Sequence, residues 1–413
     1  MKKTLAAVAV LGAFAGSALA ADVQLYGIVD TGVGYNHVDM DSLDGATLTK
    51  GGKAAYSFAD SDSFSMMSGQ ASGSRWGLKG TEDLGNGLTV GFILEDGFTS
   101  DNGADSAPMF NRESSLFVQG GFGKFAMGRM GSLNNGQSSW AKVGMVSAFG
   151  TSDWGGYSAQ LGNIFSLAGQ WDNMVAYETP SFAGFKVYAQ YAMGSNDNEN
   201  ESSSDRYYAI GATYNNGPFA GYFAVDSINY QTADADGALA NASDIDDSLT
   251  ITFGGNYDFE VLKLFAGAQY FDEIKLSKMG CGLGMMDASE FNSREEIIDP
   301  VTKKQTGWNN GFASAFKGWS LGVSASIPAA GGQVLVGAAY LDAEAADSVG
   351  KDYDKDELSR WIVSAGYDYP LSKRTNVYGV VTYAQDSLES TKSNIKDQDP
   401  TIFAAMVGIR HKF

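Results

Sequence analysis

The sequence predicts an all-β fold, a sixteen-stranded antiparallel barrel that crosses a membrane. From 21 to 413, segments of about ten residues alternate apolar with polar or small side chains, which is the period of two of a β-strand. Phe185 and Val187 point one way, for example, while Lys186 and Gln190 point the other. The breaks between segments alternate between very short and very long. This rhythm is typical of membrane barrels, which carry tight turns on one rim and long loops on the other.

Residues 1–20 are expected to be a cleaved secretory signal peptide, and 21–413 the barrel domain. Lys2 and Lys3 precede an apolar stretch at 5–14, and Ala18-Leu19-Ala20 is a small-residue cleavage site. The apolar stretch is shorter than the roughly 20 residues that a spanning helix needs. The mature chain is therefore predicted to be exported.

The first five strands follow from alternation and turn chemistry. In the first, Leu25 and Val29 share one face, and Gln24 and Asp30 share the other. The strands are expected near 23–36, 70–82, 88–97, 111–120 and 124–130, with short turns at 83–87 and 121–123. Both turns are rich in glycine, which adopts positive φ at no steric cost.

Five further hairpins and a last strand complete the count. Their short turns are 180–184, 215–217, 258–260, 328–332 and 371–375, and the last strand is 400–413. Asn215-Asn216-Gly217 is the strongest of these turns, because Asn and Gly tolerate positive φ. The long breaks are expected near 37–69, 98–110, 131–170, 195–204, 228–247, 272–316, 343–356 and 386–399. An even number of strands places both ends of the barrel on the short-turn side, as in bacterial outer-membrane barrels.

Closure follows from the membrane environment. In hydrocarbon every backbone N–H and C=O needs a partner within the chain, and an open sheet would leave a row of them unpaired at each edge. Sixteen strands make a barrel too wide for side chains to fill, so the lumen is expected to hold water. The polar positions expected to face it include Lys186, Gln190, Lys263, Gln269, Arg360 and Ser364.

Composition excludes several functional classes. The formal net charge is −20, or −22 without Lys2 and Lys3, which argues against nucleic acid as a partner. The chain has one cysteine, Cys281, so no intrachain disulfide can form, and its role stays open. Its two histidines, His37 and His411, lie at a loop start and near the last rim, so no enzyme is predicted.

No cofactor or tight metal site is predicted. The stretch 232–243 has spacing like that of a calcium loop, but Thr232 and Ser243 replace its first and last acidic ligands. Loose binding of divalent cations by the acidic loops, beside lipopolysaccharide, remains an alternative to a solvated surface. The long breaks 37–69 and 272–316 are also large enough for an adhesive role that would add to conduction.

Six stretches in the same order resemble the general porins of Gram-negative bacteria. They are VQLYGIVDTGV, SRWGLKGTEDLGNGL, GGFGKFAMGR, YETPSFAGF, YDYPLSKRTNVYG and VGIRHKF. The resemblance is to the trimeric sixteen-stranded type of beta-proteobacteria and covers nearly the whole mature chain. The aromatic final residue Phe413, on a face with Phe403, Val407 and Ile409, is similar to the assembly signal that the outer-membrane machinery reads.

The resemblance implies an outer-membrane channel for passive diffusion of small hydrophilic solutes and ions. Its partners would be outer-membrane lipid, lipopolysaccharide, the assembly machinery and two further copies in a homotrimer. It also implies that the third extracellular loop, here 131–170, folds inward and narrows the lumen. In such porins, basic residues on the wall face acidic residues on this loop. The preferred solute and the pore radius stay open.

The basic wall carries over onto Arg75 and Arg129, with Lys79 and Lys142 as further basic residues and Asp153 as the loop acid. Arg75 also follows from alternation, because its neighbours Trp76 and Leu78 take the lipid face. A midplane Arg facing lipid would cost about 2–4 kcal/mol.

Strict alternation groups Arg129 with Phe125 and Met127, on the lipid side. A bulge at Gly128, or an exit from the strand, would be needed to turn Arg129 inward. We favour the pore position. Relatives often carry an Arg where this chain has Ala176, so the basic cluster is expected to be thinner here.

The loop 131–170 contains only Lys142 and Asp153 as charged residues, but five aromatics: Trp140, Phe149, Trp154, Tyr157 and Phe165. They either pack the loop onto the inner wall, which we favour, or form a surface for aromatic or sugar-like solutes. A basic constriction with acidic vestibules predicts weak ion selectivity, because salt screens exposed loop charges within about 8 Å.

Overall fold

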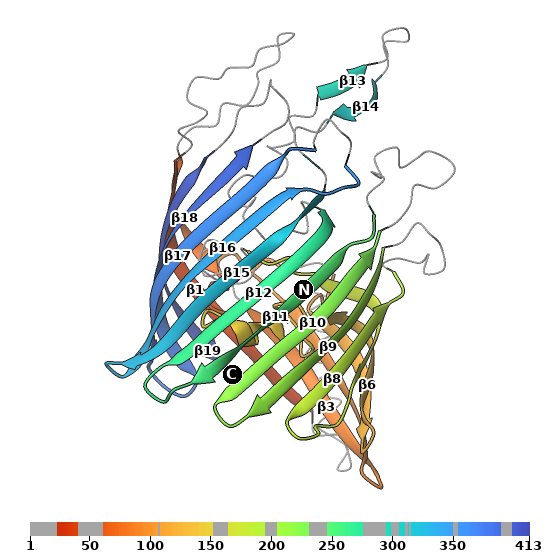
Figure 1. Ribbon diagram of the computed structural model, residues 1–413. Helices are drawn as coiled ribbons and strands as arrows, with labels where there is room; N and C mark the ends of the chain where they lie inside the picture. The colour runs from red at the N-terminus through yellow and green to blue at the C-terminus, as the bar shows by residue number, and fades with distance from the viewer. Residues whose placement is uncertain are drawn as a thin grey trace.

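The computed structural model confirms a closed antiparallel β-barrel (Figure 1). The residues it describes are 23–39, 61–105, 108–151, 164–194, 205–230, 246–275, 295–298, 305–309, 313, 315–349, 354–389 and 399–413. Among them, no helix has both the length and the apolar character needed to cross a membrane. Strands provide nearly all of the regular structure.

The first half of the wall contains β1 (Gln24–Asp39), β2 (Ser61–Ser68), β3 (Arg75–Gly85), β4 (Leu88–Gly97), β5 (Glu113–Gly120), β6 (Gly123–Gly131), β7 (Gln170–Glu178), β8 (Phe185–Ala192) and β9 (Arg206–Asn216). The second half contains β10 (Phe219–Asn229), β11 (Leu249–Asp258), β12 (Lys263–Lys275), β15 (Ala315–Ala329), β16 (Gly332–Ala345), β17 (Glu357–Pro370), β18 (Thr375–Glu389) and β19 (Thr401–Lys412). A short hairpin, β13 (Glu295–Ile298) and β14 (Gln305–Asn309), forms a sheet of its own.

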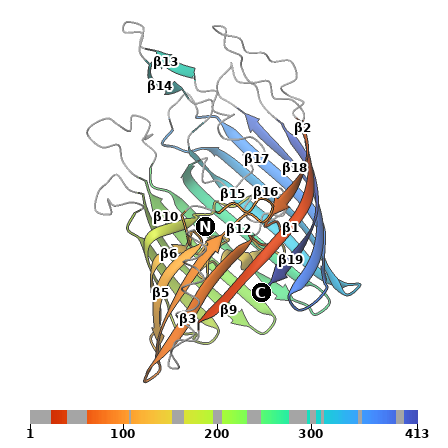
Figure 2. The same ribbon diagram turned by 180° about the vertical axis from the view of Figure 1, so that it is seen from behind.

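Seventeen strand segments share the barrel sheet, but they fill sixteen places in its wall. β2 pairs with the stretch of β1 from Thr31 to Val38, and β3 pairs with the stretch from Gln24 to Ile28. The two segments therefore occupy one place, one after the other along the same edge of β1 (Figure 2). The expected number of sixteen is confirmed in this sense.

The last strand closes the barrel against the first. β19 pairs antiparallel with β1 from Ile28↔Lys412 to Asp39↔Thr401. The backbone groups of Gly27 and Phe413 also exchange hydrogen bonds of 3.2 and 3.1 Å. A Cβ on Gly27 would lie 2.3 Å from the Phe413 ring, so this seam requires glycine there. Closure leaves no free sheet edge at this seam.

Two predicted long breaks are partly wrong. The break 37–69 contains β2, and the break 272–316 contains β13 and β14. In β2, Ser63 and Ser65 alternate with Phe64 and Met66, which are 73% and 57% exposed. This alternation is the same signal as in the other strands, but the segment spans only eight residues.

The barrel is apolar outside and polar inside. Exposed large apolar residues occur on strands all around the wall and include Leu25, Leu116, Met127, Ile210, Phe253, Val323, Val363, Val407 and Ile409. Alternate positions on the same strands are buried and often polar, such as Gln190, Gln269, Arg360 and Ser364. An apolar outer surface is what hydrocarbon requires, and it excludes a sandwich whose apolar faces meet in a dry core.

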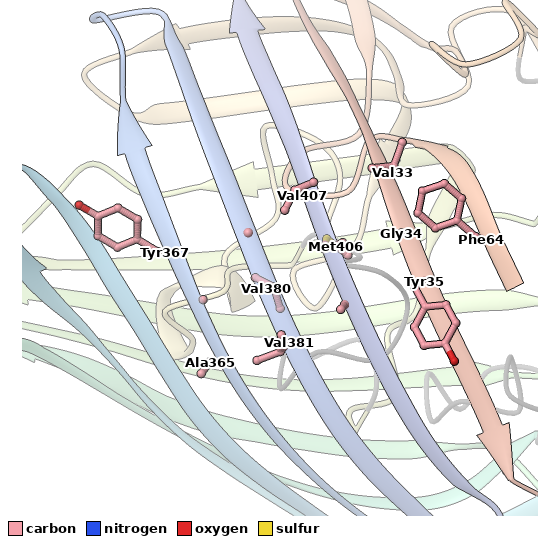
Figure 3. A pocket seen from close by; sticks show the side chains of 13 residues that line it. Val33, Gly34, Tyr35, Phe64, Ala365, Tyr367, Val380, Val381, Met406 and Val407 are labelled. Carbon is pink, nitrogen blue, oxygen red and sulfur yellow. The ribbon is translucent and has the colours of Figure 1, made fainter. Parts of the chain in front are cut away.

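A shallow apolar hollow lies on the outer face where the two ends of the chain meet (Figure 3). Val33, Gly34 and Tyr35 of β1 line it together with Phe64 of β2 and Val407 of β19. Glycine and alanine make up much of its floor on β17 to β19. It faces away from the lumen, so it belongs to the lipid or subunit side of the wall.

Candidate functional site

The chain between β6 and β7 lies against the lumen face of the wall. We call its described residues, 131–151 and 164–170, the inner segment. A short 3₁₀ helix within it, η2 (Val143–Val146), contacts β10, β11 and β12. The buried apolar residues of the segment are Leu133, Trp140, Val143, Val146, Phe149, Ile164, Phe165 and Ala168. Their burial removes apolar surface from water and holds the segment on the wall.

Trp140, Phe149 and Phe165 are 1%, 2% and 0% exposed. These three aromatics therefore pack the inner segment against the wall, which is the favoured of the two alternatives. They offer no stacking surface to a solute. Trp154 and Tyr157 lie outside the described residues.

Small residues on the wall allow this close approach. A Cβ on Gly254 of β11 would lie 2.9 Å from Cγ1 of Val146, and one on Gly267 of β12 would lie 2.7 Å from its Cγ2. Both glycines sit opposite each other in the β11–β12 pair. They make a shallow seat that Val146 occupies.

Two lumen-facing glutamines clamp the backbone of the inner segment. The N–H of Leu133 donates to Oε1 of Gln190 (3.0 Å), whose Nε2 donates to the carbonyl of Gly131 (3.1 Å). Gln269 does the same at Ser166, accepting from its N–H (2.6 Å) and donating to its carbonyl (3.1 Å). In both cases a side-chain amide supplies the hydrogen bonds that the buried peptide groups need.

Further polar contacts fix the middle of the segment. Nδ2 of Asn256 donates to the carbonyl of Met145 (2.8 Å), and the N–H of Ala148 donates to Oγ of Ser324 (2.8 Å). The Tyr222 hydroxyl donates to Oδ1 of Asn134 (2.7 Å). The contacts come from β10, β11 and β15, so the segment crosses several strands.

Glu113, at the start of β5, holds the inner segment at Ser138 and Ser139. Its carboxylate accepts from the N–H and Oγ of Ser139 (2.8 and 3.0 Å), from Oγ of Ser138 (3.1 Å) and from Oγ of Ser115 (2.8 Å). The residue is 1% exposed. A buried carboxylate needs such donors, because an unpaired buried charge is strongly unfavourable.

Across the lumen the wall carries three arginines, Arg75, Arg112 and Arg410, which we call the arginine wall. Nε of Arg112 and Nε of Arg75 lie 2.7 and 3.5 Å from the two oxygens of Glu95. The Tyr26 hydroxyl also donates to Glu95 (3.0 Å).

Other groups hold the arginine wall at its ends. Nη1 of Arg112 donates to Oε1 of Gln137 on the inner segment (2.8 Å), and Nη1 of Arg75 donates to the carbonyl of Gly73 (2.9 Å). Arg410 is held by Asn376, Ser72 and Asp368, with Nη2 3.3 Å from the Asp368 carboxylate. The guanidinium planes are thus fixed by several bonds each, which limits their motion.

A cavity of about 730 Å³ separates the arginine wall from the inner segment. All three arginines line it, and so does Asp368. The other side consists of uncharged residues, namely Gly136, Gln137, Ala148, Phe149, Gly150 and Thr151. Ser326, Gln333 and Leu335 of β15 and β16 complete the ring. Within the described residues the site is therefore a slot with charge on one side only.

The structure places Arg75 in this cavity and Arg129 elsewhere. Arg129 pairs in register with Ser114, on the face that carries the exposed Leu116 and Met127. Its Nη1 lies 2.5 Å from Asp172, and its Nε donates to the carbonyl of Asn111 (2.7 Å). The β6–β7 register does shift between Gly128, whose φ is +134°, and Met130. Arg129 nevertheless keeps its pairing with Ser114 of β5 and is absent from the cavity lining.

The other predicted residues also lie outside the cavity. Nζ of Lys79 sits 5.1 Å from the centre of the Tyr26 ring. Nζ of Lys142 donates to the carbonyl of Ser139 (2.9 Å) and sits 5.4 Å from the centre of the Tyr188 ring. Asp153 lies outside the described residues, so the expected acidic partner on the loop cannot be placed.

Sequence reasoning missed Arg112 and Arg410 as partners of Arg75. Alternation in the last strand sets Arg410 on the face opposite Phe403 and Ile409, so a signal for its inward position was present. The expected strand 111–120 included Arg112, and strict alternation would group it with the outward Leu116. In the structure β5 begins at Glu113, so Arg112 lies before the strand and alternation does not orient it. The three arginines meet only if residues of β3, β19 and the start of β5 lie at the same level along the barrel axis. The stagger of the strands, or shear, sets that level.

Comparison with known proteins gives a consistent result. The sequence profile of the Gram-negative porin family matches residues 6–388. The chain is 34% identical to an outer membrane porin protein of Bordetella pertussis and 29% identical to outer membrane porin protein 32 of Delftia acidovorans, each alignment covering 100% of both chains. Among solved structures, the anion-selective porin from Comamonas acidovorans superposes with a TM-score of 0.63 at 23% identity, covering 95% of this chain and all of that one.

Proposed function

Because this chain belongs to the Gram-negative porin family, we propose that its narrowest passage is the cavity between the arginine wall and the inner segment. The protein is an outer-membrane channel for passive diffusion of small solutes. Its relatives are channels and not enzymes, and we assign it a transport role. The proposal concerns where solutes are sorted along that channel.

One observation carries the proposal: among the described residues that line it, the cavity has charge on one side and none on the other. Sixteen strands enclose more space than side chains fill, and the inner segment occupies part of it. The charges on the remaining wall therefore act on a solute over a short distance. Electrostatic interactions there are stronger than those of charges on exposed loops.

We propose weak selectivity for anions. The charged residues that line the cavity are three arginines and one carboxylate, Asp368. Two further carboxylates lie behind the lining, Glu95 against Arg75 and Arg112 and the buried Asp30 near Arg410. Glu95 has little effect on a passing ion, because Arg75 and Arg112 both pair with its carboxylate. The acidic balance of the whole chain acts from outside this slot and is screened by salt.

The test is the reversal potential of the channel in a planar bilayer under a salt gradient. Arg75→Gln with Arg410→Gln is expected to move the permeability ratio of anions to cations about fivefold towards cations, the factor that ~1 kcal/mol gives. Arg374→Gln, in the exposed turn before β18, is the matched control and should leave the ratio unchanged. An unaltered ratio in the double variant would remove the arginine wall from the passage.

We also propose the remaining sequence expectations as properties of the mature protein. Residues 1–20 act as a cleaved signal peptide, and 21–413 form the barrel. The chain assembles as a homotrimer in contact with lipid and lipopolysaccharide. Phe413, 44% exposed on the outer face, acts as an assembly signal. Replacement of Phe413 by Ala, with Lys412→Ala as control, should lower the amount of barrel in the outer membrane; equal amounts would contradict the signal.

A further inference from the structure

We propose that Lys124, Lys142 and Lys186 form a second binding station for small doubly charged anions, on the short-turn side of the inner segment. We call these three residues the lysine cluster. The inference rests on the channel function proposed above. It adds a site that a solute meets before or after the arginine wall.

The wall supplies two of the three lysines and one acid. Lys124 of β6 pairs in register with Glu178 of β7, and Glu178 pairs with Tyr188 of β8. Lys186 stands two residues before Tyr188 on the same face, with its Nζ 2.9 Å from the Glu178 carboxylate. Tyr188 is 3% exposed, so this face points inward. Lys124 and Lys186 both directly follow short turns, which places the cluster near that rim.

The inner segment supplies Lys142 from the other side. Its Nζ donates to the Ser139 carbonyl and lies 5.4 Å from the centre of the Tyr188 ring. Residues from the segment and from the wall therefore meet at one place. Lys142 belongs to the same loop whose base Glu113 anchors through Ser138 and Ser139, so its position is fixed by contacts independent of its charge.

Aromatic rings also hold Lys124. Its Nζ lies 4.4 Å from the centre of the Phe117 ring and 4.9 Å from that of Trp140. A ring face attracts an ammonium group but does not neutralise it. Within the part of the chain that the structure describes, neither Lys124 nor Lys142 has a carboxylate at ion-pair distance.

Two carboxylates, Glu178 and Glu113, lie near the three ammonium groups, so the cluster keeps an excess of one positive charge. Glu113 is buried and accepts hydrogen bonds from serines, so it is not available to a solute. Each ammonium has three donors, and the bond to Ser139 uses one donor of Lys142. The remaining donors and the excess charge suit an anion with several acceptor oxygens. A doubly charged oxyanion or a dicarboxylate matches these donors better than chloride does.

The pKa of Lys142 reflects its burial and the charges around it. Burial inside the barrel lowers the pKa of Lys142 to about 8, with Lys124 and Lys186 lowering it further and Glu178 and Glu113 raising it. Lys142 is thus mostly charged at pH 7 and mostly neutral at pH 9. A bound anion would favour the charged form, so binding should weaken as the pH rises through this range.

The lysine cluster is separate from the cavity of the arginine wall. None of its three lysines lines that cavity. An anion that crosses the barrel would therefore meet two positive stations, the arginine wall and the lysine cluster. Two moderate sites in series allow binding without trapping the solute, which a single strong site would do.

The experiment measures block of chloride current by sulfate in a planar bilayer. Sulfate is chosen because its charge does not change between pH 7 and 9. The full-length mature protein should show a conductance that millimolar sulfate reduces. Lys124→Gln with Lys142→Gln should weaken the apparent affinity for sulfate about tenfold, the effect expected for two charges near a dianion in a partly wet site.

Lys263→Gln is the matched control. Lys263 also faces the lumen near the short turns and also lies over a ring, with its Nζ 5.5 Å from the centre of the Phe265 ring. Sulfate block should be unchanged in this variant. Equal sulfate block in the wild type and in the double-lysine variant would overturn the proposal and leave the channel function intact. A wild-type protein that shows no conductance in the bilayer would instead refute the channel function.

A second measurement separates binding from a merely structural role of Lys142. Sulfate affinity of the wild type should fall several-fold between pH 7 and pH 9. Lys142→Arg should keep its affinity over that range, because a guanidinium stays protonated. A wild-type affinity that does not vary with pH, or an Arg variant that loses affinity in parallel, would contradict the assignment of Lys142.

Discussion

The two halves of the lumen wall are built on opposite principles. From β8 to β15 the wall is covered by the inner segment, through apolar packing and neutral hydrogen bonds such as those of Gln190 and Gln269. From β17 through β19 and β1 to β5 it is left open and carries arginines paired with carboxylates. Arg75, Arg112 and Arg410 of this half line the cavity, whereas Arg360 and Asp386 are buried as a pair.

The difference shows how a wide barrel can be made into a narrow channel. A segment docked inside the lumen needs partners for its own peptide groups, and uncharged side chains such as Gln190, Gln269 and Asn256 supply most of them without a desolvation penalty for ions. The arginines need water or counter-ions, so they belong on the open half. The three variants below test this division, beginning with the largest expected effect.

The largest effect should come from the open half, at the buried pair of Arg360 and Asp386. Their side chains are 1% and 2% exposed, and Nε of Arg360 lies 2.5 Å from the carboxylate. Arg360→Ala should lower the free energy of unfolding by about 3–5 kcal/mol, because it leaves Asp386 buried without its counter-charge. Urea unfolding in lipid vesicles measures the change.

Lys317→Ala is the control for this variant. Lys317 pairs with Asp347 at 2.5 Å, but Asp347 is 86% exposed. Water screens such a pair, so the loss should be at most about 1 kcal/mol. Equal losses in the two variants would mean that burial does not distinguish these ion pairs.

A smaller effect is expected in the covered half, at Leu133. This side chain is 0% exposed within the packed inner segment. Leu133→Ala should lower the free energy of unfolding by about 3 kcal/mol and leave a cavity beneath the segment. Single-channel recordings should show added current noise, because a loosened segment moves in the passage.

Leu84→Ala provides the comparison, since Leu84 is 51% exposed at a short turn. It should change stability by less than about 0.5 kcal/mol and leave the current steady. A quiet channel in Leu133→Ala would show that packing at this position does not hold the segment in place.

The smallest effect is expected for Arg129, which the sequence had placed in the passage. Because it pairs with Asp172 and is absent from the cavity lining, Arg129→Gln should leave the reversal potential unchanged. Its loss of stability should stay near 1 kcal/mol, as for other partly exposed pairs. A shift of the reversal potential as large as that of the Arg75→Gln, Arg410→Gln variant would mean that Arg129 does act on ions in the passage.

The strands were predictable because each one carries its own information. Alternation in β1 placed Leu25 outside and Asp30 inside, and the structure confirms this at 50% and 0% exposure. Turn residues such as Asn216 and Gly217 act locally as well, and the structure has them at the β9–β10 turn. The β2 segment escaped because it is short and isolated by a break from the strand that it continues.

The site was less predictable because it joins residues from distant strands. Arg75 was found by alternation, but Glu95, Arg112 and Arg410 join it only through the stagger of neighbouring strands. Sequence gave no reason to separate Lys142 from the arginines, since both are basic and near the lumen. Only the path of the inner segment directs Lys142 towards Tyr188 and away from the cavity.

The sequence by itself determined the strand pattern, the closed barrel and the inner and outer faces, since the period of two and the turn chemistry are properties of neighbouring residues. The tertiary structure alone decided which lumen charges meet, because the shear of the barrel and the docking of the inner segment set the height of each side chain. Both depend on contacts between residues a hundred or more positions apart, such as Met145 with Asn256 and Ser166 with Gln269.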